Sequence, residues 1–368
     1  MSRSVLALAT TAVLLAAAGC SVESDSEEPT ATHTGEASAE APTTEAGQTT
    51  PEDRASTASP EGTAGAGLSA YGMALLATPV EATHLTVTDF DAVRGRLGVP
   101  DLTSADLMTD RLEFWRAAEG SSVLLSDGLL RLENSRYDLT YGFTQDDVDA
   151  EVHWTGPDGG GFLLALRPGL DLDLVQAAID DDAPGLADAI LDPATATVGQ
   201  GVGTDAVWAT SSHSAAARVG EVPAESLIVR NGCVPFADAL GVDATVEDQE
   251  EVLDAHDVES LLDVEAVAIA FTGHQATIRL AYPHGTDPAA IEADLAARLS
   301  LAQDWPITES IGFLDGFADG TVGGVDVEIG ELEFTVTNPT AAALLALADL
   351  VPLGVCTDVE PLAEPTGL

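Results

Sequence analysis

Two stretches of this chain repeat one order of signals, a β-hairpin followed by a helix. Each copy has two strand patterns around a glycine-containing turn, and a pattern of helical period follows. In the first copy the strands are predicted at 150–154 and 162–167, the turn at 157–161 and the helix at 171–180. In the second copy the strands are predicted at 264–271 and 276–282, the turn at 272–274 and the helix at 287–299. We therefore expect a tandem repeat.

Further strand patterns follow each copy, and each half ends with a helical pattern. The strand patterns are 206–210, 215–219, 226–230, 325–329 and 332–337, and the helical ones are 234–240 and 339–349. The tight turns favour antiparallel pairing, because parallel strands need long crossovers. We predict an α+β fold with two similar lobes, at residues 68–245 and 246–368. Each lobe would be an antiparallel sheet with helices packed on one face.

A further helix is predicted at residues 103–119, where capping-box residues precede the helical pattern and a glycine follows it. Its Met108, Leu112 and Trp115 fall on one helical face, so they are predicted to belong to the core.

The N-terminal segment has the features of a secretion signal. Arg3 is its only charged residue, residues 5–18 are apolar, and Gly19 and Cys20 follow. The sequence at 17–20 resembles the lipobox of bacterial lipoproteins, and the composition is similar to that of uncharacterised actinobacterial lipoproteins. The resemblance implies a signal peptide at 1–19, lipidation of Cys20 and a cell-membrane location on the extracytoplasmic face. Ordinary secretory cleavage, which would leave Cys20 as a free thiol, remains the alternative.

Residues 20–67 are predicted to be a disordered tether, because they consist mainly of Ser, Thr, Glu, Ala, Pro and Gly. The whole chain has a formal net charge of −49 and contains no lysine. This charge excludes nucleic acid as a partner, since binding it requires cations that neutralise phosphates. It favours a salt-tolerant or GC-rich source. The functional alternative is an acidic surface that collects cations or cationic substrates.

Cysteine counting predicts one disulfide. If Cys20 carries lipid, Cys233 and Cys356 remain as a pair in an exported chain. Two buried thiols are the alternative.

The sequence contains no P-loop, HExxH, GxSxG or suitably placed GxGxxG motif. We predict no enzymatic activity, no metal site and no cofactor. The weaker candidates are a nucleophile and base at Ser212 and His213, zinc at His274 or His284, and calcium at the glycine turns that follow Asp315 and Asp319.

The predicted function is binding or interaction in the cell envelope, through a lipid-anchored surface protein of unknown specific activity. Its expected partners are the membrane, reached through the lipid, and either cations or an envelope protein. The alternatives are a solute-binding lipoprotein of an uptake system and a secreted hydrolase that assembles Ser212, His213 or His274 in space.

Overall fold

The computed structural model describes residues 68–362, except 205, 211–213 and 309. These residues belong to one compact unit, Thr63–Leu368. The leader, Cys20 and the tether lie outside the described residues, as do Ser212 and His213.

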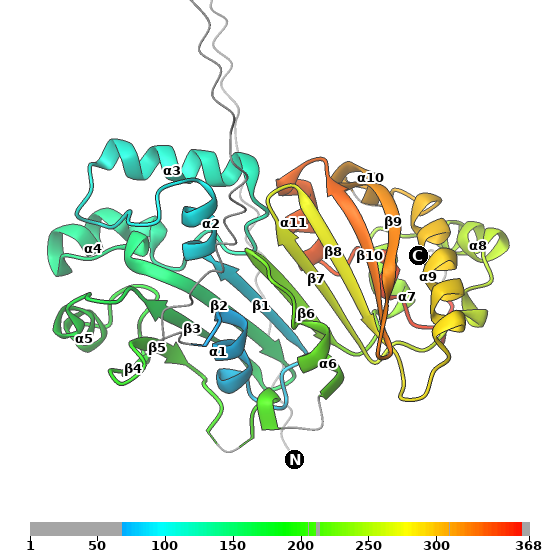
Figure 1. Ribbon diagram of the computed structural model, residues 1–368, viewed down its shortest axis with the longest axis horizontal. Helices are drawn as coiled ribbons and strands as arrows, with labels where there is room; N and C mark the ends of the chain where they lie inside the picture. The colour runs from blue at the N-terminus through cyan, green and yellow to red at the C-terminus, as the bar shows by residue number, and fades with distance from the viewer. Residues whose placement is uncertain (1–67, 205, 211–213, 309, 363–368) are drawn as a thin grey trace, which may run out of the picture. The chain divides into compact units, whose positions relative to one another are not determined.

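The described strands form one ten-stranded sheet in which every neighbouring pair is antiparallel (Figure 1). The strands are β1 (His84–Asp89), β2 (Val148–Gly156), β3 (Gly159–Leu166), β4 (Ile190–Asp192), β5 (Thr197–Gln200), β6 (Ser226–Asn231), β7 (Ala266–Thr272), β8 (Gln275–Ala281), β9 (Phe317–Asp326) and β10 (Ile329–Val336). Helices accompany the sheet, so the predicted antiparallel α+β class is confirmed.

The sheet contains an internal repeat. Counted outward from its middle, one half runs β1-β2-β3-β5-β4 and the other runs β6-β7-β8-β10-β9. The equivalent strands β1 and β6 pair antiparallel at the centre, with His84 opposite Arg230 and Val87 opposite Leu227. We call this central β1–β6 pairing the seam. It joins the two halves into one continuous sheet, and by sheet order the second repeat begins at β6, before the predicted lobe boundary at 245.

Helices cover both faces of the sheet, whereas the sequence predicts one. Face A carries Phe162 and Ile278, and its core includes residues of α4 (Asn134–Tyr141), α5 (Leu172–Asp180), α9 (Pro288–Gln303) and α11 (Pro339–Leu347). Face B carries Val87 and Leu227 under α1 (Ala70–Ala77) and α6 (Ser214–Val219). The central strands are therefore buried on both sides, as in the continuous apolar run of β7, although such a run does not by itself distinguish a strand from a buried helix.

The helix after each hairpin starts at a local cap. The Asp171 carboxylate accepts a hydrogen bond from the Asp173 amide at α5, and the Asp287 carboxylate accepts one from the Ala289 amide at α9. The other α-helices are α2 (Phe90–Arg96), α3 (Met108–Ser121), α7 (Phe236–Leu240), α8 (Val246–Ala255) and α10 (Phe313–Gly316).

Several local predictions differ from the structure. The predicted strand at 325–329 spans the turn between β9 and β10, where Val327 and Glu328 have positive φ angles. The predicted strand at 215–219 is α6, whose alanines suit a helix packed on the sheet. The predicted strand at 206–210 contains the short 3₁₀ helix Trp208–Thr210. Helix α3 starts only at Met108, because Thr103 and Asp106 close a separate turn. Trp115 is buried as predicted, but Met108 and Leu112 are about half exposed.

A buried ion pair holds α9 against the C-terminal segment. The Asp294 carboxylate accepts hydrogen bonds from Arg298 Nε at 2.7 Å, from the Tyr282 hydroxyl at 2.7 Å and from the Leu262 amide at 2.8 Å. Arg298 is fully buried and also donates to the carbonyls of Leu353 and Leu262. These hydrogen bonds therefore fix α9 to Leu262, to Tyr282 and to the C-terminal segment at Leu353.

Cys233 and Cys356, the pair that cysteine counting predicts, form a disulfide with their Cα atoms 5.1 Å apart. Cys233 follows β6 and Cys356 follows α11, so the bond encloses β7–β10 and α7–α11. A backbone bridge between Val234 and Val355 lies beside it. The disulfide thus ties the two ends of the second repeat together.

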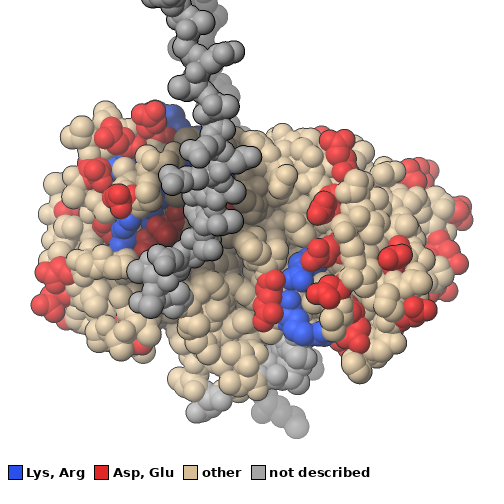
Figure 2. Space-filling view, viewed as in Figure 1, with Lys and Arg blue, Asp and Glu red and all other residues tan. Residues whose placement is uncertain are grey.

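Acidic side chains are spread over the visible surface, whereas arginines gather in a few small groups beside acidic residues (Figure 2). Most described arginines pair with a carboxylate, for example Arg94 with Asp149 and Arg279 with Glu331. The arginines are thus largely neutralised locally, and the acidic excess remains uncompensated. No helix in the part of the chain that the structure describes has the length and apolar character needed to cross a bilayer.

Candidate functional site

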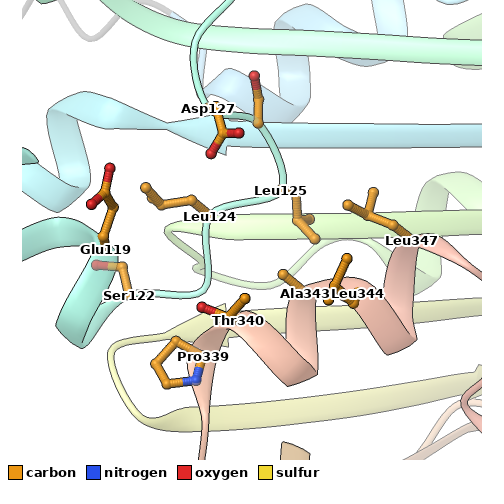
Figure 3. A pocket seen from close by; sticks show the side chains of 11 residues that line it. Glu119, Ser122, Leu124, Leu125, Asp127, Pro339, Thr340, Ala343, Leu344 and Leu347 are labelled. Carbon is orange, nitrogen blue, oxygen red and sulfur yellow. The ribbon is translucent and has the colours of Figure 1, made fainter. Parts of the chain in front are cut away.

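A pocket of about 220 Å³ lies between the end of α3 with its following segment and helix α11 (Figure 3). One wall comes from the first repeat and the other from the second. We call it the seam pocket; its lining residues are Glu119, Ser122, Leu124, Leu125, Ser126, Asp127, Pro339, Thr340, Ala343, Leu344 and Leu347.

The first wall is anchored to the strands beneath it. Val123 and Leu125 are buried in the core that Ile228 of β6 shares with α11. Farther along, Ser126 and the Leu129 amide donate hydrogen bonds to the carboxylate of Glu151 in β2. Because the segment from Val123 to Leu129 is held by both the core and Glu151, it forms a fixed wall of the pocket.

Glu151 is the buried charge beneath this wall. Burial acts to raise the pKa of its carboxyl group, but hydrogen bonds from His153, Ser126 and the Leu129 amide outweigh burial and lower the pKa. His153 Nε2 lies 2.6 Å from the carboxylate. Acyl transfer by a triad needs the histidine between nucleophile and acid, whereas here the acid lies between Ser126 and His153. The arrangement therefore positions the wall and does not activate Ser126.

The second wall is the outer face of α11. The Asn338 side chain caps this helix by accepting from the Thr340 and Ala341 amides. Its alanines are buried against the sheet, but Leu344 and Leu347 are 50% and 47% exposed at the pocket. These two half-exposed leucines form an apolar patch beside the pocket.

The rim of the seam pocket is acidic. Glu119 pairs with Arg131 at 2.5 Å, and the Arg131 guanidinium lies 4.2 Å from the centre of the Trp115 ring. Asp127 is exposed and makes no ion pair with the residues that the structure describes. The pocket can therefore accept an apolar group, and its rim favours a neutral or positively charged group beside it.

A polar cluster lies at the start of β1, around His84. His84 Nε2 lies 2.7 Å from Arg230 Nη1 and 3.0 Å from an Asp349 carboxylate oxygen, and Arg230 also pairs with Asp349. The Thr83 hydroxyl is 3.0 Å from His84 Nδ1. Although hydroxyl, imidazole and carboxylate follow the order of a triad, Arg230 shares the imidazole nitrogen that faces Asp349. The cavity beside Arg230 and Asp349 measures only about 20 Å³. The cluster therefore ties β1, β6 and the end of α11 together.

The structure does not bring the predicted metal candidates together. His274 lies in the β7–β8 turn, whereas His284 follows the other end of β8, is exposed and pairs with Glu328. Asp315 caps the Gly312 amide, and Asp319 lies within β9. The described part of the chain has no group of three or more His, Cys, Asp or Glu side chains arranged to hold a metal ion.

Sequence reasoning missed both the seam pocket and the His84 cluster, because each joins residues from the two halves of the chain. Neither a family model, a curated protein nor a solved structure matches this chain.

Proposed function

We propose that this protein is a lipid-anchored extracytoplasmic surface protein that binds a partner protein in the cell envelope through the seam pocket. The half-exposed Leu344 and Leu347 over a pocket shared by both repeats are the observation that carries the proposal. The location is supported by the apolar leader and by the lipobox-like sequence that ends at Cys20.

The size of the seam pocket favours a protein partner. A volume of about 220 Å³ holds one or two apolar side chains. Small-molecule sites commonly occupy about 300–1,000 Å³ and enclose most of the ligand. An apolar anchor seated in a small pocket, with a polar rim around it, is the usual anatomy of a protein interface.

The solute-binding alternative has less support from the fold. Uptake proteins of that class close two lobes about a hinge, but here backbone pairing continues across the seam from His84–Arg230 to Thr88–Ser226. Closure there would break those hydrogen bonds. The hydrolase alternative requires Ser212, His213 or His274 beside an acid, and of these Ser212 and His213 lie outside the described residues. A serine-reactive probe that labels Ser212 would favour it.

Photo-crosslinking in intact cells tests the binding site. A photoreactive residue at Leu344 should give one discrete protein adduct, and Leu347→Glu in the same chain should abolish it by placing a charge in the pocket. Leu139, an 89% exposed leucine of α4, is the matched control position. The same adducts from positions 344 and 139, or no adduct from 344, would contradict the proposed site.

A separate experiment tests the anchor. Globomycin should leave an unprocessed precursor, and mass spectrometry of the mature N-terminus should find acylated Cys20. Cys20→Ser should release the protein into the medium. Normal processing in the presence of globomycin would refute lipidation without affecting the seam-pocket test.

A further inference from the structure

A second cavity, of about 490 Å³, lies beside the face B residues Val87 and Leu227. It lies where α1, the end of β1, the start of α2 and the segment before β6 meet. We call it the Asp89 cavity; its lining residues are Ser69, Ala70, Tyr71, Val87, Asp89, Ala92, Arg96, Val222, Pro223, Ala224, Glu225, Ser226, Leu227 and Thr272. Most of this lining is apolar.

Two of the charges in the cavity neutralise each other. Arg96 Nε pairs with the Glu225 carboxylate, which is 4% exposed and also accepts from the Gly273 amide. Arg96 is held further by the Ser121 carbonyl and the Ser122 hydroxyl. The two groups therefore satisfy each other and contribute no net charge to the cavity.

Asp89 is the charge left over. Its carboxylate caps α2, with one oxygen accepting the Ala92 amide at 2.9 Å, and it forms no ion pair with an arginine or histidine of the described residues. Burial raises the pKa of the Asp89 carboxyl group. The Ala92 and Asp91 amides and the more distant Arg94 favour its charged form. Burial outweighs these favourable groups, so the cavity contains a poorly solvated carboxylate that caps α2 and forms no ion pair with the described residues.

The remaining lining is suited to the hydrocarbon part of a ligand. The Tyr71 hydroxyl donates to the Ala216 carbonyl at 2.9 Å, which fixes the ring at the cavity wall. A Cβ atom at Gly220 would lie 2.3 Å from that ring, so the ring is also packed against the backbone. An aromatic face attracts cations as well as apolar groups.

We propose that the Asp89 cavity binds a small aliphatic ammonium ion, with Asp89 as counter-ion and with Tyr71 and the apolar wall around the hydrocarbon. A calcium ion needs about six to eight oxygen ligands, and this cavity offers one unpaired carboxylate. A guanidinium group prefers both oxygens of a carboxylate, but the Ala92 amide occupies one. An alkylammonium group can donate one of its three N–H bonds to a single carboxylate oxygen, without the paired geometry that a guanidinium prefers. This inference does not rest on the seam pocket, although Arg96 of the Asp89 cavity donates a hydrogen bond to Ser122 of the seam-pocket lining.

Calorimetric titration of the mature protein at low ionic strength tests the site, with n-butylammonium as the probe. We expect it to bind about tenfold or more tightly than n-butanol, with no binding of n-butyrate. Asp89→Asn should lower the affinity for butylammonium by a similar factor. Asparagine caps helices as well as aspartate does, so this variant should fold, as a circular dichroism melt would verify.

Asp91→Asn is the matched control. It removes an equal charge two residues from Asp89, and the Asp91 side chain is 59% exposed. Its affinity for butylammonium should stay within about twofold of the wild type, as for an exposed charge in water. Equal losses in the two variants would show diffuse surface attraction and overturn the site. Butanol binding as tightly as butylammonium, or calcium binding that Asp89→Asn abolishes, would also overturn it.

Discussion

Removal of the Cys233–Cys356 disulfide should destabilise the protein through its unfolded state. The two cysteines are 123 positions apart, and closing a loop of that length restricts the unfolded chain by about 16 cal/mol/K. At 25 °C this corresponds to about 5 kcal/mol of stability. For a folded unit of about 300 residues, the melting temperature of the Cys233→Ser, Cys356→Ser double variant should fall by about 8 °C.

The native structure around the disulfide should survive this change. The Val234 amide donates to the Gly354 carbonyl, and the Cys356 amide donates to the Val234 carbonyl, each at 2.8 Å. These contacts keep the two segments together without the covalent bond. The double variant should therefore retain its secondary structure by circular dichroism while losing stability.

Guanidinium chloride unfolding measures the loss. The midpoint should fall, and the slope should rise because the unfolded chain becomes less compact. Reductant should produce the same change in the wild type and none in the double variant. A stability loss below about 1 kcal/mol would refute the loop-entropy argument, since about 5 kcal/mol is expected.

Three further predictions follow from buried and surface charge. Asp294→Ala should cost about 3 to 5 kcal/mol, because it leaves Arg298 buried without a counter-ion; a loss below about 1 kcal/mol in chemical denaturation would contradict this. Melting temperature should rise from low to molar salt, since cations screen the acidic excess, and a flat or falling curve would remove that explanation. Asp89→Asn should raise the melting temperature at neutral pH. Burial raises the folded-state pKa of Asp89, so its ionisation disfavours folding as pH rises above the ordinary value of 3.8. Below that pH the two proteins should melt alike, and equal melting at neutral pH would show that the carboxylate carries no penalty.

Turn chemistry made the two hairpins predictable from the sequence. Gly159 and Gly273 have positive φ angles in their turns, and the strands on either side are long enough to show their pattern. The segment 215–219 was predicted wrongly as a strand, because five residues are too few to distinguish a buried strand from a short helix.

The joining of the two halves could not be read from local patterns. The pairing of β1 with β6 brings together His84 and Arg230, which are far apart in the chain. The seam pocket has the same origin, because Leu124 and Leu344 come from different halves of the chain and line one pocket only in the folded structure. Nothing in the alanine- and leucine-rich composition of α11 distinguishes its exposed Leu344 and Leu347 from its buried Leu345.

The pairing of β1 with β6 also determines which strands are left at the borders of the sheet. One border is β4, which has only three residues. The other is β9, whose pairing with β10 is interrupted by two register shifts and which carries Asp319 and Asp326. Short, irregular and charged borders resist pairing with another chain. Many copies of this protein could therefore crowd together without their sheets polymerising end to end.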